Sequence, residues 1–188
     1  MKENNKNSRM KKKKLTSDLT LYFNKNFPAV YSTKSGKRYT VYLGLGGNIG
    51  DVFKRFDNLL KRFKYDTNIV LIETSLLLEN PPFGYLEQDY FLNGVVKIGT
   101  NMPPYYLLKS MQKYEKRFAR VRTFQDAPRT LDIDIIFIQI NGRNIQINKK
   151  DLIVPHAGWK YRDSVKIPLK YMKSNIKSKD KAYSNERK

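Results

Sequence analysis

Apolar and polar positions follow two different periods along the middle of the chain, and these periods predict its secondary structure. Runs of branched aliphatic and aromatic residues are typical of strands, whereas apolar residues three or four positions apart are typical of an amphipathic helix. The expected elements, in chain order, are strand 40–45, helix 52–63, strand 69–78, strand 91–98, helix 102–118 and strand 131–138.

Turn and cap residues separate these elements. Gly46 to Gly50 ends the first strand, and Asp51 is a suitable N-cap for the helix that follows. Pro103 stands near the start of the second helix, where a missing N–H costs nothing. Asn141-Gly142 predicts a tight hairpin after the last long strand. The order predicts an α+β protein with a ferredoxin-like βαββαβ sandwich, in which helices pack on an antiparallel sheet, plus a C-terminal extension of a hairpin and short elements.

Charge divides the chain into three parts. The formal net charge is +20, and residues 1–38 hold 11 Lys/Arg against 2 Asp/Glu, while residues 173–188 hold 6 against 2. Both ends are rich in lysine, asparagine and serine, a composition that buries little apolar surface. We therefore expect a basic, mobile N-terminal extension over 1–38, whose removal leaves kinetics unchanged, a folded domain over 39–172, and a basic tail over 173–188.

The lysine run from Lys11 to Lys14 has two interpretations. Such a run can bind the phosphates of a nucleic acid, or it can be a solvated segment without a partner.

The chain has no cysteine, which excludes disulfides and thiolate ligands. It also has no apolar run of the roughly 18 residues that a membrane span needs, and no apolar segment typical of a signal peptide. We expect a cytoplasmic protein with no membrane partner.

Two carboxylates interrupt the strand near 131–138. Asp132 and Asp134 are two positions apart, so their side chains point to the same face of a strand. Like charges this close raise each other's pKa unless a cation lies between them. Mg²⁺ is held by one or two carboxylates together with substrate phosphates. The pair therefore indicates a metal site, although pairing with arginines in a solvated cleft is the alternative.

Basic and aromatic residues near this strand suit a phosphorylated ligand. Arg120, Arg122 and Arg129 precede the carboxylates, and the planar guanidinium group matches phosphate oxygens. The glycine run 44–50 matches neither the dinucleotide-binding nor the P-loop spacing, so we interpret it as a tight turn. Phe91 and Asn93 share one strand face, where they can bind a flat heterocycle or simply serve packing and a turn.

The motifs, taken in order, resemble the 6-hydroxymethyl-7,8-dihydropterin pyrophosphokinase family of folate biosynthesis. The resemblance covers roughly 40–172 and is most specific at Pro-Arg-Thr-Leu-Asp-Ile-Asp. The matching segments are Leu43 to Asp51, Pro81-Pro82-Phe83-Gly84, Phe91 to Val96, Gln112 with Glu115, Arg120-Val121-Arg122, Pro128 to Ile135 and Val154-Pro155-His156.

This resemblance implies transfer of the β,γ-pyrophosphoryl group of ATP to the pterin, with release of AMP. It implies two Mg²⁺ ions on Asp132 and Asp134, with ATP and the pterin as the small-molecule substrates. We expect a monomeric enzyme. The residues implied in catalysis are Arg120, Arg122, Arg129, Asp132 and Asp134. Those implied in ATP binding are Gln112, Arg120, Arg122, Arg129, Ile135, His156, Lys160 and Arg162. Those implied in pterin binding are Asn80, Pro81, Phe83, Phe91, Asn93 and Asp132.

Some positions depart from the family pattern. An aromatic residue expected two positions after Arg162 is Ser164, and the basic loop lacks its usual tryptophan. Trp159 or Tyr161 would have to supply the second stacking ring. Two other functions remain open at this point: a basic ferredoxin-like nucleic-acid-binding module, and a homologue with lost or altered pterin activity.

Overall fold

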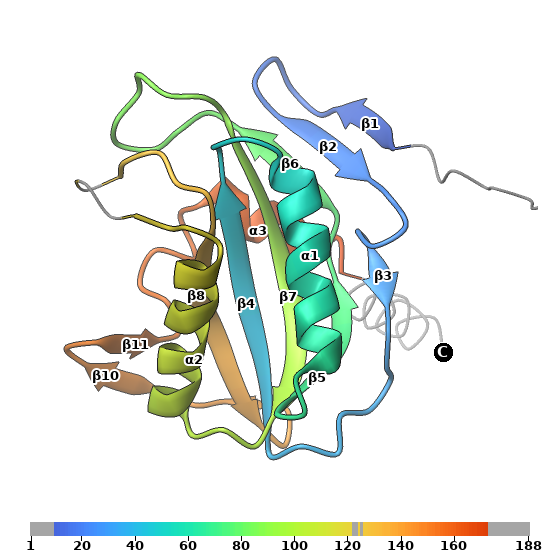
Figure 1. Ribbon diagram of the computed structural model, residues 1–188, viewed down its shortest axis with the longest axis vertical. Coiled ribbons are helices and arrows are strands. Elements are labelled where there is room, and N and C mark those ends of the chain that lie inside the picture. The colour runs from blue at the N-terminus through green and yellow to red at the C-terminus, as the bar shows by residue number, and fades with distance from the viewer. Residues whose placement is uncertain (1–9, 122–123, 125, 173–188) are drawn as a thin grey trace, which may run out of the picture.

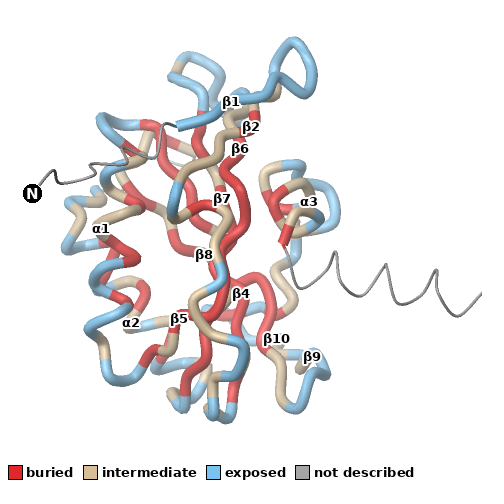
Figure 2. Tube along the Cα trace, turned by 90° about the vertical axis from the view of Figure 1, so that its right-hand side faces the viewer, coloured by how far each residue is buried: buried red, intermediate tan, exposed pale blue. Residues whose placement is uncertain are grey.

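The protein is built in three layers. The computed structural model describes residues 10–121, 124 and 126–172. Helices α1 (Val52–Tyr65) and α2 (Pro104–Arg117) lie on one face of a large antiparallel sheet, and α3 (Asp163–Lys170) lies on the other face, as Figure 1 and Figure 2 show. The expected α+β class is therefore confirmed. No helix in the described part of the chain is long and apolar enough to cross a lipid bilayer.

The large sheet contains nine strands, with its longest strands at the centre. Its main path runs β1-β2-β6-β7-β4-β8-β9, with β5 beside β7 and β3 beside β5. The strand bounds are β1 Lys11–Lys14, β2 Thr20–Phe23, β3 Ala29–Val30, β4 Tyr39–Gly47, β5 Ile69–Thr74, β6 Leu77–Asn80, β7 Phe91–Thr100, β8 Asp132–Ile140 and β9 Arg143–Asn144. A separate hairpin pairs β10 (Ile147–Lys149) with β11 (Leu152–Val154).

Helix α1 forms where the apolar spacing predicts it. The Asp51 carboxylate accepts a hydrogen bond from the Lys54 backbone N–H at 2.9 Å, which confirms the expected N-cap. The helix buries one apolar face against the sheet, where the side chains are almost fully removed from water. These side chains are Val52, Phe56, Leu59, Leu60 and Phe63.

Two strands differ from their predicted bounds. The strand expected over 69–78 is divided at Ser75, because the Ser75 hydroxyl accepts a hydrogen bond from the Val95 N–H at 2.8 Å and donates one to the Leu76 carbonyl. The first core strand continues to Gly47 instead of ending at Leu45. The close approach of the Thr130 carbonyl, 2.6 Å from a Cβ built at Gly47, favours glycine there.

The N-terminal segment is not the mobile extension that its composition predicts, at least from residue 10 onward. Strand β2 pairs with β6, and β3 pairs with β5, so the segment extends the main sheet. Leu21 and Phe27 are 1% and 0% exposed. The prediction was wrong because the charge is concentrated on β1, whose lysines are all exposed, while a few apolar residues further on are buried. Residues 1–9 and 173–188 lie outside the described residues.

The packing of this segment predicts that Phe27→Ala destabilises the whole domain. The Phe27 ring lies 6.2 Å from the Phe56 ring of α1, centroid to centroid, inside the main core. Removing a buried phenylalanine side chain costs about 3–5 kcal/mol. Denaturant unfolding should show a loss of this size. Val30→Ala, at a residue that is 48% exposed on β3, is the control and should change stability by less than about 0.5 kcal/mol. Equal, small losses for both variants would contradict the docking of this segment.

Candidate active site

The carboxylates, the aromatic–amide pair and two of the arginines meet in one cavity of about 330 Å³ at the end of the sheet. The lining comes from β4, the end of β6 and the loop after it, β7, the loop before β8, β8, the start of α3 and Leu19. Its predicted members are Asn80, Pro81, Phe83, Phe91, Asn93, Arg129, Asp132, Asp134 and Arg162.

Two glycines of β4, Gly44 and Gly46, line the cavity without side chains that would crowd it. Gly44 pairs with Asp134 and Gly46 with Asp132 across the β4–β8 ladder. A Cβ at Gly46 would lie 3.0 Å from the Asn93 side-chain oxygen, and one at Gly44 would lie 3.1 Å from Ile136. The glycines therefore belong to the strand beneath the cavity, rather than to the tight turn predicted for this run.

The two aspartates point into the cavity together. Both line it, while the intervening Ile133 packs in the main core on the opposite face of β8. Burial, reinforced by the charge of Asp132, raises the pKa of Asp134, and His156 and Arg162 oppose this shift. Among the described residues, none forms an ion pair with Asp134. The site therefore concentrates negative charge that the described side chains neutralise only in part.

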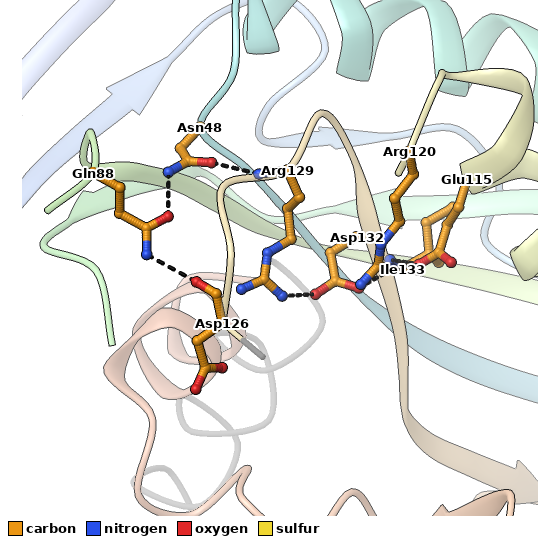
Figure 3. Close-up of polar contacts among 8 residues, drawn as sticks. All are labelled: Asn48, Gln88, Glu115, Arg120, Asp126, Arg129, Asp132 and Ile133. Atoms are coloured by element: carbon orange, nitrogen blue, oxygen red, sulfur yellow. Dashed lines mark hydrogen bonds and ion pairs between the residues drawn. The ribbon is translucent and has the colours of Figure 1, made fainter. Parts of the chain in front are cut away.

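Arginines bracket Asp132, as Figure 3 shows. Arg129 donates to one carboxylate oxygen of Asp132 at 2.9 Å, and Arg120 bridges the other oxygen to Glu115. Glu115 also accepts the Ile133 backbone N–H at 2.8 Å. Burial is the main cause that raises the pKa of Glu115 to about 7. The chain of contacts fixes both guanidinium groups beside the aspartates.

Glu115 was not assigned a role from the sequence, although a signal was present. It lies four residues after Met111, within the apolar stripe of α2. A carboxylate on the buried face of a helix needs a partner, because burying an unpaired charge is costly. Arg120 is that partner here, and it carries the interaction on to Asp132.

Asn48 fixes the loop that carries Arg129. Its side-chain oxygen accepts the Arg129 backbone N–H at 2.8 Å, and its amide donates to Gln88 at 2.9 Å. Gln88 in turn donates to the Asp126 carbonyl at 2.9 Å (Figure 3). No sequence pattern predicts this role, because Gln88, Asp126 and Arg129 are all distant from Asn48 along the chain. The arrangement joins three loops around the cavity mouth.

Arg129 contacts both parts of the site. The charged half is formed by Asp132 and Asp134 with the arginines, and the aromatic half is formed by Phe91 and Asn93. Its guanidinium carbon lies 5.1 Å from the centre of the Phe91 ring. Its Nε–H is buried and has no hydrogen-bond partner among the described residues. A buried donor of this kind is suited to an anionic ligand.

The aromatic half offers a ligand one ring, that of Phe91, and one side-chain amide, that of Asn93, whose orientation is fixed by a hydrogen bond. Phe91 and Asn93 lie on the same face of β7, and the Asn93 amide donates to the Asn80 side-chain oxygen at 2.8 Å. Phe83 is 74% exposed, with the Arg162 guanidinium 5.6 Å from its ring centre. A flat ligand can thus meet Phe91 while its edge meets an oriented amide.

Of the other predicted residues that the structure describes, five do not line this cavity: Gln112, Arg120, Ile135, His156 and Lys160. The Ile135 side chain is buried in the core, because alternate positions of β8 face the helices, so only its backbone is available to a ligand. Gln112 is half-buried on α2, and the His156 ring nitrogen accepts the Gly158 N–H at 3.3 Å. Lys160 is exposed, with its Nζ 5.9 Å from the Trp159 ring. Arg122 lies outside the described residues.

The second stacking ring that the resemblance requires is not supplied by Trp159. That ring packs edge-on against Phe137, with centroids 4.8 Å apart. Ser164 lines the cavity with a small polar side chain, and Tyr161 also lines it but is 86% exposed. Apart from the buried Val165, the α3 side of the cavity is therefore polar or open.

The donor set fits Mg²⁺. Among the described residues, no group of three or more histidine, cysteine or acidic side chains is arranged to hold a metal ion. Two carboxylates on one face suffice for Mg²⁺, which completes its shell with water and substrate phosphates. An ion bound here would therefore depend on a phosphorylated ligand.

Paired carboxylates, two arginines and an aromatic–amide pair in one cavity suit a site for a phosphorylated ligand. The family model for 7,8-dihydro-6-hydroxymethylpterin-pyrophosphokinase matches residues 42–174. The chain belongs to this family.

Relatives with established names agree with this membership. The 2-amino-4-hydroxy-6-hydroxymethyldihydropteridine pyrophosphokinase of Campylobacter jejuni is 40% identical over 145 residues, which cover 76% of this chain and 88% of that protein. The enzyme of the same name from Helicobacter pylori is 37% identical over 145 residues, 76% of this chain and 86% of its own length. The folic acid synthesis protein FOL1 of Dictyostelium discoideum is 39% identical over 137 residues, 72% of this chain but 20% of that protein.

Proposed function

We propose that the protein transfers the pyrophosphoryl group of ATP to 6-hydroxymethyl-7,8-dihydropterin, giving the pterin diphosphate and AMP. The observation that carries this proposal is that one cavity combines the paired aspartates with Phe91 and Asn93. In the reaction, the pterin hydroxymethyl oxygen bonds to the β-phosphorus of ATP. The bond from that phosphorus to the oxygen of the α-phosphate breaks, and the hydroxyl proton is released.

Asp132 and Asp134 would hold the Mg²⁺ ions. When bound, these ions supply positive charge to the polyphosphate and orient it. Asp132 has a second task, because it fixes Arg120 and Arg129 on either side of itself. We assign charge stabilisation of the phosphate oxygens to these two arginines and to Arg122. Gln112, His156, Lys160, Arg162 and the backbone at Ile135 are assigned to ATP.

The pterin occupies the aromatic half of the cavity in this proposal. Phe91 stacks on the ring, and Asn93 hydrogen-bonds to its edge, held in place by Asn80. Pro81 and Phe83 line the loop side, and Asp132 marks the border with the phosphates. The acceptor hydroxyl thus points toward the carboxylate and arginine groups.

Further assignments follow from the same function. We classify β4 to β8 as a ferredoxin-like core and place the activity in residues 39–172. We assign the enzyme to the cytoplasm, as a monomer. A nucleic-acid-binding role is not favoured, since paired carboxylates without a metal repel phosphates.

The metal dependence is tested by removing divalent ions. We expect a chelator to abolish AMP formation and added Mg²⁺ to restore it, while added Na⁺ at equal ionic strength does not. Activity that persists in excess chelator would contradict the assignment of the aspartates to Mg²⁺.

A further inference from the structure

One residue of the cavity comes from the N-terminal segment, outside the region that matches the family. Leu19 lines the same cavity as Phe91 and Asn93, whereas the family match begins at residue 42. Leu19 is half-buried, and it directly precedes β2. The segment that composition suggested to be a passive tail therefore reaches the site.

The hairpin between β1 and β2 holds the Leu19 backbone firmly. The Leu19 carbonyl accepts the Leu15 N–H at 2.8 Å, and its N–H donates to the Thr16 hydroxyl at 3.1 Å. The next residues pair with the strand that leads to the cavity: Thr20 lies opposite Glu79, and Leu21 opposite Leu78. Because Asn80 follows directly on β6, the pairing brings the end of the hairpin to the site.

The alternation of β2 turns the Leu19 side chain toward the α3 face of the sheet. Residues two apart on a strand share a face, and Leu19 joins Leu21 in a cluster that also contacts Ile167 of α3. Tyr22 points the other way, with its ring 5.2 Å from the Phe53 ring of α1. The face on which Leu19 packs carries the cavity.

We infer that Leu19 contacts the acceptor heterocycle and that the N-terminal hairpin is part of the acceptor-binding site. This inference rests on the proposed function. The start of α3 offers Asp163, Ser164 and the buried Val165 to the cavity, and Tyr161 beside it is largely exposed, so Val165 is the apolar side chain that this helix contributes. Leu19 supplies an apolar surface there, which removes water from one side of a flat, uncharged ring. It positions the acceptor and takes no part in phosphate chemistry.

Leu19→Ala tests the inference because it should change the KM for the pterin without changing the KM for ATP. We expect the KM for the pterin to rise about 5- to 20-fold, a size typical of lost apolar contact in a pocket. The kcat and the KM for ATP should stay within about twofold of wild type. Leu15→Ala is the matched control, because Leu15 lies in the same hairpin, is 41% exposed and does not line the cavity. It should leave all three parameters unchanged.

A role in stability alone gives a different result. In that case Leu19→Ala would lower the unfolding temperature and leave the pterin KM of the folded fraction unchanged, which would overturn the inference. Should Leu19→Ala fail to fold, Leu19→Thr is assayed in the same way, with the same expected and contradicting results. Wild-type protein that forms no pterin-dependent AMP would instead refute the proposed function, and pterin fluorescence titrations of wild type and variant would then decide the Leu19 contact separately.

Discussion

Asp132→Asn is expected to lower kcat by about a thousandfold or more while the protein stays folded. Asparagine keeps the shape of the side chain but removes its charge, so both tasks of Asp132 fail together. The proposed Mg²⁺ site loses one of its two carboxylates, and Arg129 loses the carboxylate that it contacts at 2.9 Å. Loss of a single preorganised electrostatic contact in an active site costs on the order of 10²–10³ in rate, and here two kinds of contact are lost.

Both the reaction rate and the thermal stability of the Asp132→Asn variant are measured. AMP formation gives kcat, and thermal unfolding shows whether the variant is intact. Asp151→Asn is the matched control, since Asp151 is exposed in the turn between β10 and β11. It should retain the wild-type rate. A near-normal rate for Asp132→Asn would contradict the metal assignment.

Arg129→Ala is expected to affect both substrates, with kcat reduced about 10²- to 10³-fold and a raised KM for the pterin. The rate falls because a guanidinium group beside the phosphates is lost. The acceptor KM rises because Arg129 also lies 5.1 Å from the Phe91 ring centre and supports that side of the cavity. Arg129→Lys should recover only part of the rate, since lysine keeps the charge but lacks the planar fork.

The control for Arg129 is a basic residue outside the site. Arg143→Ala, at an exposed position of β9, removes the same kind of side chain. It should leave both parameters unchanged. An Arg129→Ala variant with a lowered kcat but an unchanged pterin KM would show that Arg129 does not contribute to pterin binding.

Local sequence patterns were sufficient to predict the core elements. The spacing of apolar residues predicted α1 with its buried face, and the Asp132/Asp134 spacing predicted two carboxylates on one face of a strand. These features depend on residues close together in the chain, where the period of a helix or a strand fixes which side chains share a face.

Features that depend on distant contacts were not predictable in the same way. Asn48 acts through Gln88 and Arg129, and no local period connects these residues. Residues 10–38 were expected to be mobile because their average composition is polar, yet burial of Leu21 and Phe27 does not depend on the average. The division of the strand at Ser75 follows from its hydrogen bonds with Val95, a partner on another strand.

The most direct test of the whole account is the nucleotide product formed by the purified protein. ATP and Mg²⁺ are incubated with and without 6-hydroxymethyl-7,8-dihydropterin, and AMP and ADP are separated by chromatography. We expect AMP in amounts equal to the pterin diphosphate, formed only when the pterin is present. ADP as the product, or AMP that forms equally without the pterin, would contradict pyrophosphoryl transfer to this acceptor.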